Sequence, residues 1–349
     1  MSDPAPSTVR AATANAPLGR RTRIVDVARE AGVSAQTVSN VLNGRPGFSD
    51  ATRARVLAAV EDTGYVPDQA GRHLRTGQSR RIAFSMTEEN LDARNPFALT
   101  FLQAVMTTAA DLDRRVLVFT HASGSVEAFR ADAVGRETDG FILANSAPGD
   151  YRVEILEELG IPYALMGRTL PTQSQEWIDI DNAAAIRRAV DHAVARGFRE
   201  LAYADYGGEA HWSLERLRGV REGLAAHGLT LSDERIIRGP IDRIQKRLTR
   251  MLEKDALLDG VLTASDSIGI MAVNVAHAAG RDVGTDFAVT GFDGGVLAST
   301  VIPNLTTVRI PVAEIARRLM VGLTELIDTG KRWPAGEIVD TELVIGGSA

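Results

Sequence analysis

The residues between positions 34 and 40 carry the most informative side-chain chemistry in this sequence. They are Ser34, Ala35, Gln36, Thr37, Ser39 and Asn40. The amides of Gln and Asn can form paired hydrogen bonds with adenine, and a small Ala side chain can contact a thymine methyl group. The hydroxyls of Ser34 and Thr37, together with a helix N-terminus, suit phosphate groups. One helix presenting this set to the major groove could read DNA; the alternative is the solvated polar face of an ordinary helical bundle.

Capping residues and apolar spacing predict two helices joined by a short turn around this segment. Thr22 is expected to cap the first helix and Gly32 to end it; Ser34 and Gly44 are expected to cap and end the second. The apolar residues at helical spacing are Ile24, Val27, Ala28, Ala31, Val38, Val41 and Leu42. Only AGVS separates the two helices, and a turn of this length predicts helix-turn-helix geometry.

A third helix is expected to complete a small core. Ser49 or Asp50 can cap it, and Gly64 can end it. The residues expected to point inward are Val56, Leu57 and Val60. The region from 22 to 66 is therefore predicted to form one all-α DNA-binding domain.

The stretches DVAREAGVSAQTVSNVLNG, FSDATRARVLAAVEDTGYVP and LRTG resemble the DNA-binding headpiece of the LacI family of transcriptional regulators. The resemblance extends from about Arg23 to near the C-terminus. It implies that Ala35, Gln36 and Asn40 read bases. It also implies that Leu74 wedges into the minor groove at the operator centre, where such a wedge unstacks a base step.

The segment 67–77 is expected to act as a conditional hinge helix within a hinge and linker at 67–79. It is too short to be stable alone and contains Gly71, so we expect it to fold only when two copies pack together on DNA. Asp68 and Gly71 depart from the Asn and Ala usual in the family. A Gly in place of Ala costs roughly 1 kcal/mol in a helix interior, which predicts a hinge that orders less readily.

Charge divides the chain in the same way. Residues 1 to 81 contain 12 Lys and Arg against 7 Asp and Glu, whereas the remainder contains 27 against 38. The balances of +5 and −11 sum to the net charge of −6. A basic N-terminal part attached to an acidic body fits a nucleic-acid partner at the N-terminal end, although this asymmetry is modest by itself.

Composition excludes several classes of protein. No apolar run approaches the roughly 20 residues that span a bilayer, and residues 1–21 lack an apolar signal region, so a disordered arm is expected there and no membrane partner. The chain has no Cys, which excludes disulfides and thiol chemistry and suits a cytoplasmic protein.

Beyond Arg81, short apolar strands alternate with amphipathic helices, which predicts parallel sheets flanked by helices and a ligand site at the carboxyl ends of the strands. The family resemblance implies a periplasmic-binding-protein-like α/β body of two parallel-sheet lobes at 80–349. Lobe 1 is expected at about 80–178 and 310–335, and lobe 2 at about 179–309 and 336–349. The crossovers are expected near Asp179, Arg309 and Pro334.

Enzyme motifs are missing from this sequence. It contains no GxGxxG, Walker, GxSxG or HExxH pattern, and its six His residues show no ligand spacing on a common helix face. We therefore expect no catalytic residues, no metal and no cofactor.

A sugar ligand needs two-point polar groups and an aromatic plate. Phe97 at a helix start, Asn145 after a strand and Arg168 after the next strand have this chemistry. For each, an ordinary structural role is the alternative: a core Phe, a turn Asn, a surface ion pair.

The family resemblance adds Arg216 and Asp293 as effector-binding residues. Capping a helix is the alternative for Asp293 and is the role expected of Asp266 and Asp181. Ser265 stands where the family often has Asn, which removes one two-point contact. Trp177 and Trp212 could lend stacking surface to a ligand; for Trp177, packing at a lobe crossover is the alternative.

These inferences predict a homodimeric regulator that binds palindromic operator DNA, most simply a repressor of carbohydrate-use genes controlled by a sugar bound between the lobes. One headpiece reads only a few base pairs, so two are needed for useful affinity. Whether the effector induces or corepresses stays open. The alternatives are a solute-binding module, a regulator responding to a nucleobase or sugar phosphate, and a sugar-processing enzyme.

Overall fold

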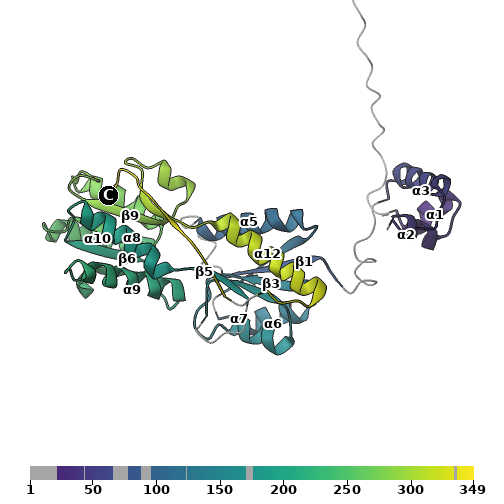
Figure 1. Cartoon of the computed structure of the whole chain (residues 1–349), viewed down its shortest axis with the longest axis horizontal. Helices are drawn as coiled ribbons and strands as arrows, with labels where there is room; N and C mark the ends of the chain where they lie inside the picture. The colour runs from purple at the N-terminus through teal and green to yellow at the C-terminus, as the bar shows by residue number, and fades with distance from the viewer. Residues whose placement is uncertain are drawn as a thin grey trace, which may run out of the picture. The chain divides into compact units, whose positions relative to one another are not determined.

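The computed structural model describes residues 22–42, 44–65, 78–87, 96–122, 124–169, 176–333 and 336–349. It divides into two compact units, Met1–Gly77 and Gln78–Ala349, which are considered separately (Figure 1). Several expectations lie outside the described residues: the arm at 1–21, the hinge segment 67–77 with Leu74, and the crossover near Pro334.

The first unit contains the three expected helices. They are α1 at Ile24–Ala31, α2 at Ala35–Leu42 and α3 at Asp50–Thr63. Their buried core consists of Val27, Ala28, Ala31, Val38, Val41, Val56, Ala59 and Tyr65. The predicted ends of these helices are confirmed, because Gly32, Gly44 and Gly64 all adopt the left-handed backbone that stops a helix.

Two details of the headpiece were predicted wrongly. Thr22 does not cap α1: its hydroxyl donates to the carbonyl of Thr63 at 3.1 Å, while the Asp26 carboxylate accepts the Arg23 N–H at 3.0 Å. Leu57 is 50% exposed, because Ala59 takes the inward place on α3. The hydroxyl of Thr22 thus ties the start of α1 to the end of α3.

The first lobe of the second unit is built on a six-stranded sheet in the order β11-β5-β4-β3-β1-β2, and all its pairings are parallel. The strands are β1 at Arg81–Thr87, β2 at Arg115–His121, β3 at Gly140–Leu143, β4 at Tyr163–Met166, β5 at Trp177–Ile180 and β11 at Glu337–Val339. The helices of this lobe are α5 at Phe97–Asp111, α6 at Val126–Val134, α7 at Tyr151–Leu159 and α12 at Val312–Thr329.

The second lobe has a six-stranded sheet in the order β12-β10-β9-β8-β6-β7, parallel except for the β10–β12 pair. Its strands are β6 at Leu201–Asp205, β7 at Ile236–Arg238, β8 at Gly260–Thr263, β9 at Ala288–Asp293, β10 at Thr306–Arg309 and β12 at Glu342–Val344. The α-helices are α8 at Asn182–Ala195, α9 at His211–Ala226, α10 at Ile241–Lys254 and α11 at Asp266–Ala278. Short 3-10 helices lie at Asp233–Arg235 (η2) and Val296–Ser299 (η3). The predicted architecture of two parallel-sheet α/β lobes is confirmed.

The lobe boundary near the C-terminus differs from the one expected. We expected the chain from residue 336 onward in the second lobe, yet β11 pairs with β5 in the first sheet, and only β12 joins the second. Gly336 permits this route, because its positive φ of 83° brings the chain against the Trp177 ring, where a Cβ would lie 2.5 Å from the indole. The chain therefore crosses between the sheets after Val339.

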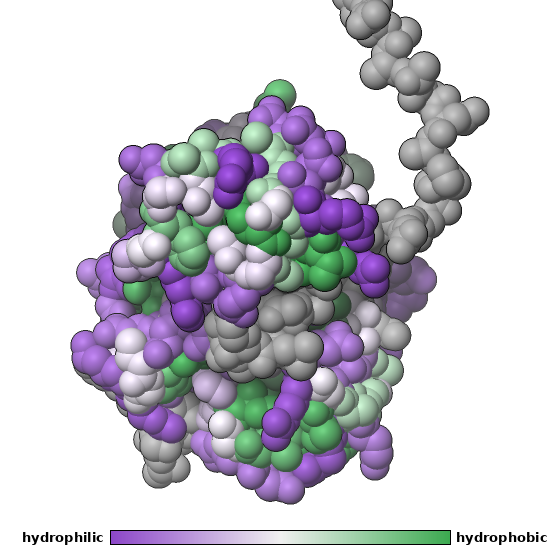
Figure 2. All heavy atoms as spheres, turned by 90° about the vertical axis from the view of Figure 1, so that its right-hand side faces the viewer, coloured by the Kyte–Doolittle hydropathy of each residue, from purple (hydrophilic) through white to green (hydrophobic). Residues whose placement is uncertain are grey.

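The surface of the molecule is mixed in polarity. On the face shown in Figure 2, hydrophobic residues gather in small patches separated by hydrophilic ones. Over the ranges that the structure describes, every helix is too short or too polar to cross a membrane.

Candidate functional site

The N-terminus of α2 carries two hydroxyls that the fold holds together. The Ser34 hydroxyl oxygen accepts the Thr37 backbone N–H at 3.1 Å, so Ser34 caps α2 as predicted. The two side-chain hydroxyls also bond to each other at 2.9 Å. This arrangement concentrates hydrogen-bonding groups at the positive end of a helix, a geometry that suits an anion such as a backbone phosphate.

Gln36 in the first turn of α2 and Asn40 in the second form another polar pair. The Gln36 amide donates to the Asn40 side-chain oxygen at 3.1 Å, so the two side chains share one helix face. Ser39 is half-buried, and Ala35 is half-buried with its methyl group packed partly on the helical core. The face therefore presents two amides whose relative orientation is already fixed. Leu74, the remaining expected DNA contact, lies outside the described residues.

A second candidate site lies between the two lobes of the body, where a cavity of about 770 Å³ is lined by residues of both. Its lining includes Phe97 and Asn145 from the first lobe and Arg216 and Asp293 from the second. Asn145 follows β3 and Asp293 ends β9, so the cavity lies at the carboxyl ends of strands as expected. The structure thus brings four of the five expected effector residues into one cavity.

Arg216 on α9 is the most constrained side chain of this cavity. It is 6% exposed, and its guanidinium lies 3.5 Å from the centroid of the Phe292 ring and 4.8 Å from that of Trp212. Its Nε donates to the Asn182 side-chain oxygen at 2.8 Å, and its Nη1 donates to the Ala264 carbonyl at 2.6 Å. The planar cation is therefore clamped between rings and acceptors, with one edge available to the cavity.

Asp293 supplies the opposite charge. Its Oδ1 lies 3.9 Å from Nη1 of Arg216. Burial raises the pKa of Asp293 well above its usual range, and the nearby Arg216 opposes that rise. Burial likewise lowers the pKa of Arg216. The pair offers a carboxyl group and a guanidinium to the same ligand.

The backbone at Asp293 is strained and is held by its neighbours. Its φ is 112°, a conformation that non-glycine residues rarely adopt and that costs on the order of 1–3 kcal/mol. Asp266 fixes the following loop, because its Oδ2 accepts the Gly295 N–H at 2.6 Å and its Oδ1 accepts the Thr307 hydroxyl at 2.5 Å. Strain of this kind concentrates at functional sites.

The predicted capping role of Asp266 is wrong. The Ser265 hydroxyl accepts the Ile268 N–H at 3.3 Å and caps α11, whereas Asp266 is the first residue of the helix. Ser265 can do this because it alone has the extended backbone of a cap. Burial raises the pKa of Asp266 to about 6.

A hydrogen bond crosses the cavity from lobe to lobe. The indole N–H of Trp212 on α9 donates to the Asn145 side-chain oxygen at 2.8 Å. Both residues line the cavity, so a hydrogen bond between the lobes lies within the cavity itself.

Arg168 is the expected effector residue that does not reach the cavity lining. Its Nε donates to Oδ2 of Asp179 at 2.9 Å, and its guanidinium lies 5.3 Å from the centroid of the Trp177 ring. Asp179 does line the cavity, and burial raises its pKa. Trp177 therefore packs on Arg168, and Trp212 is the Trp residue at the cavity.

Asp179 and Asn182 are cavity residues that the sequence did not single out. They belong to the same EWIDIDN stretch as Asp181, whose carboxylate accepts the Ala184 N–H at 2.8 Å and caps α8 as predicted. Alternation along a strand would place Asp179 and Asp181 on the same face. Because β5 ends at Ile180, Asp179 alone lies in the strand, and Asp181 lies outside it and caps α8.

Metal chemistry finds no support in the described parts of the chain. No group of three or more His, Asp or Glu residues there lies close enough together to hold an ion.

Comparison with known proteins gives two family matches and several full-length relatives. Residues 23–68 match the bacterial regulatory proteins of the lacI family, and residues 190–349 match the periplasmic binding protein-like domain. The HTH-type transcriptional regulator CelR of Thermobifida fusca is 31% identical over 335 residues, which cover 93% of this chain and 98% of CelR.

Solved structures agree with the fold. A transcriptional regulator CelR–cellobiose complex is 29% identical, with a TM-score of 0.72, and the match covers 94% of this chain and 100% of that one. The Lac repressor bound to ONPG in the repressed state has a TM-score of 0.84 at 22% identity, with 95% and 100% covered. The second likeness concerns the fold alone.

Proposed function

Since the chain belongs to the LacI family of bacterial regulatory proteins, we propose that it represses carbohydrate-use genes under the control of a sugar bound in the cleft between its lobes. The observation that carries this proposal is the clamped Arg216 beside Asp293 in a cavity of about 770 Å³. A guanidinium and a carboxyl group that face one cavity can each make two-point hydrogen bonds to neighbouring sugar hydroxyls.

Aromatic side chains support a sugar as the ligand. Phe97 and Trp212 line the cavity, are half-buried and offer flat apolar surfaces, which suit the weakly apolar faces of a sugar ring. The CelR structure that resembles this chain is described as a cellobiose complex. Cellobiose and related β-linked disaccharides are therefore the first ligands to test.

In the headpiece, we propose that α2 enters the major groove. Gln36 and Asn40 would contact base edges with Ala35, while Ser34, Thr37 and Ser39 would contact the backbone or neighbouring bases. The paired amides support this role, because both project from one exposed helix face.

We propose a homodimer as the active form, because each headpiece reads only half of a palindromic operator. Exposed apolar side chains support an interface on the first lobe: Met106 on α5 is 51% exposed and Val118 on the sheet-edge strand β2 is 43% exposed.

We propose that the ligand acts by changing the relative position of the lobes. The Trp212–Asn145 hydrogen bond joins them across the cavity, so a ligand that replaces or strengthens it has a different affinity for the two lobe arrangements. Such a change would reach the DNA through the hinge segment 67–77, with Leu74 in the minor groove.

A thermal-shift screen of sugars, sugar phosphates and nucleobases tests the identity of the effector. A ligand that binds only the folded protein raises its melting temperature with concentration. We expect β-linked disaccharides to give the largest shift. A response to a nucleobase or to a sugar phosphate, with none to any neutral sugar, would refute the carbohydrate assignment.

A further inference from the structure

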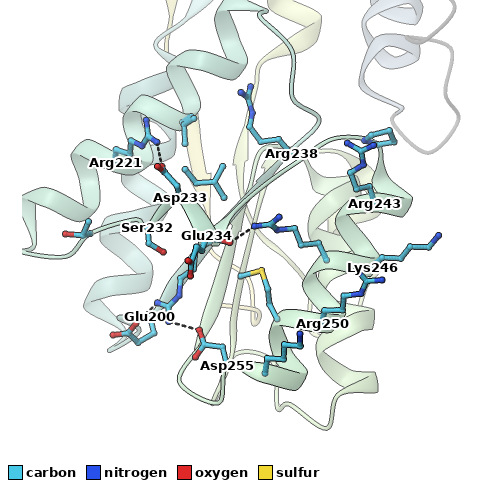
Figure 3. Close-up of a pocket in the computed structure, with 18 of the residues that line it drawn as sticks. Glu200, Arg221, Ser232, Asp233, Glu234, Arg238, Arg243, Lys246, Arg250 and Asp255 are labelled. Carbon is cyan, nitrogen blue, oxygen red and sulfur yellow. Dashed lines mark hydrogen bonds and ion pairs between the residues drawn. The ribbon is translucent and has the colours of Figure 1, made fainter.

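A second large hollow lies on the second lobe, away from the lobe cleft and beside its edge strand β7. It has a volume of about 1640 Å³ and is bordered by α9, by the segment of η2 and β7, and by α10 (Figure 3). We call it the β7 groove. Pro240 is the one residue that its lining shares with that of the cleft, so it constitutes a separate surface.

One wall of the β7 groove is a row of cations on α10. Arg243, Lys246, Arg250 and Lys254 line it and are all exposed. Their spacing of three or four residues places them along one side of the helix, over roughly 16 Å. In Figure 3, Arg243, Lys246 and Arg250 project from this one helix. Across the part of the chain that the structure describes, none of the four forms an ion pair, so their charge is available.

On the other side of the groove, the arginines already form ion pairs with carboxylates of this chain. Arg221 pairs with Asp233 at 3.0 Å, and Arg235 pairs with Asp255 at 2.8 Å and also with Glu200. Figure 3 shows the Arg221–Asp233 pair on the side of the groove away from α10. The groove as a whole is lined by eight cationic and five acidic residues, on a body whose balance from residue 82 onward is −11. The cationic wall therefore has the opposite sign to the net charge of the body.

The floor of the groove is partly apolar. Leu217 of α9, Ile236 of β7 and Met251 of α10 line it and are half-buried. Phosphate groups gain nothing from such a floor, and four separated long side chains do not converge on one small anion as a phosphate site requires. An extended chain with both acidic and apolar side chains would use the wall and the floor together.

We propose that the β7 groove docks an acidic, partly apolar segment of a partner protein, with its carboxylates against the α10 cations and its apolar side chains on Leu217, Ile236 and Met251. The position of β7 at the edge of the sheet suits an extended segment lying alongside it.

Fluorescence anisotropy of the full-length protein with a labelled short peptide, in which Glu and Asp alternate with Leu and Ile, tests the proposal. We expect saturable binding that weakens as salt is added. The variant Lys246→Glu/Arg250→Glu should lose at least about tenfold in affinity, because it opposes like charges. Arg136→Glu, a charge reversal at an exposed residue of the first lobe, should bind as the unchanged protein does.

Control peptides and competing anions distinguish the proposed acidic and apolar segment from other occupants of the groove. A peptide with Lys in place of its acids and one with Ser in place of its apolar residues should both bind at least about tenfold more weakly. Absence of saturable binding would overturn the proposal. Equal competition by inorganic tripolyphosphate or random duplex DNA would reassign the groove to anions. A change in the sedimentation coefficient of the double variant would reassign it to contacts between copies of this chain.

Discussion

At the scale of single residues, the cleft depends on how Arg216 is held. Two rings and two acceptors fix its guanidinium before any ligand arrives, so little conformational freedom is lost on binding. Asp293 lines the cavity from a strained backbone, and the hydrogen bond from the Gly295 N–H to the Asp266 carboxylate stabilises the loop that follows it. The proposed binding groups are therefore pre-positioned by their neighbours in the folded protein.

Replacing Arg216 by Ala should remove effector binding. We expect the affinity for the sugar found by the thermal-shift screen to fall by at least roughly thirtyfold, about 2 kcal/mol, because a charged hydrogen-bond donor is lost. Calorimetry measures this directly. Arg218→Ala on the same helix is the matched control. Arg218 is exposed and forms ion pairs with Glu215 and Glu222, which lie outside the cavity lining. Unchanged affinity in Arg216→Ala would exclude Arg216 from the site.

The raised pKa of Asp266 should appear in the pH dependence of stability. Its pKa is about 6 in the folded protein, whereas an unperturbed Asp titrates near about 3.9. The stabilisation from this shift is present below about pH 4 and is lost as the pH rises through about 6. The variant Asp266→Asn has no carboxyl group to titrate here, so it does not lose this stabilisation as the pH rises. The difference between its free energy of unfolding and that of the unchanged protein should therefore grow between these pH values, by up to about 3 kcal/mol.

Urea unfolding across this pH range measures the effect. Asp181→Asn serves as the control, because Asp181 caps α8 from an exposed position. A stability difference between Asp266→Asn and the unchanged protein that does not vary with pH would contradict the assignment.

Single residues also mark how far the sequence could predict the site. Phe97 at a helix start and Asn145 after a strand line the cavity as the local pattern predicts, whereas Arg216 within α9 and Asp293 at the end of β9 were indicated by the family resemblance. Arg168 stands at a strand end too, yet Asp179 holds it back from the lining. That contact joins β4 to β5 and depends on sheet order, which the local pattern does not contain.

At the scale of elements, local signals predicted the caps of α2, α3 and α8 and missed those of α1 and α11 by one residue. Ser34 and Ser49 cap α2 and α3 as expected, because each cap needs only the next three residues. Local signals did not predict the short strands β7 and β11. Each spans three residues and forms through pairing, β7 with β6 and β11 with β5. Strand pairing is a tertiary effect that overrides local preference.

The exposed face of α2 gives the element-scale prediction. Gln36→Ala should change the base preferred at one position of each half-site, because a two-point amide contact discriminates bases by about 1–3 kcal/mol. Selection from random DNA reads out the preference. Leu57→Ala on the exposed side of α3 is the control and should return the original motif. The same motif from Gln36→Ala would remove Gln36 from base reading.

At the scale of the whole molecule, assembly should depend on the first lobe. Met106→Glu/Val118→Glu should shift the protein from dimer to monomer, because two buried, unpaired carboxylates would disfavour the interface. Operator affinity should fall with it. Val134→Glu, at a 56% exposed residue on α6, is the matched control. Sedimentation that shows the double variant as dimeric as the control would place the interface elsewhere.

Linkage between the two sites tests the central claim most directly. The dissociation constant for operator DNA should be measured at rising concentrations of the effector, and that for the effector with and without operator. We predict that effector shifts operator affinity to a plateau, and that operator shifts effector affinity by the same factor, as reciprocal coupling requires. Operator affinity that does not change at saturating effector would contradict an allosteric regulator.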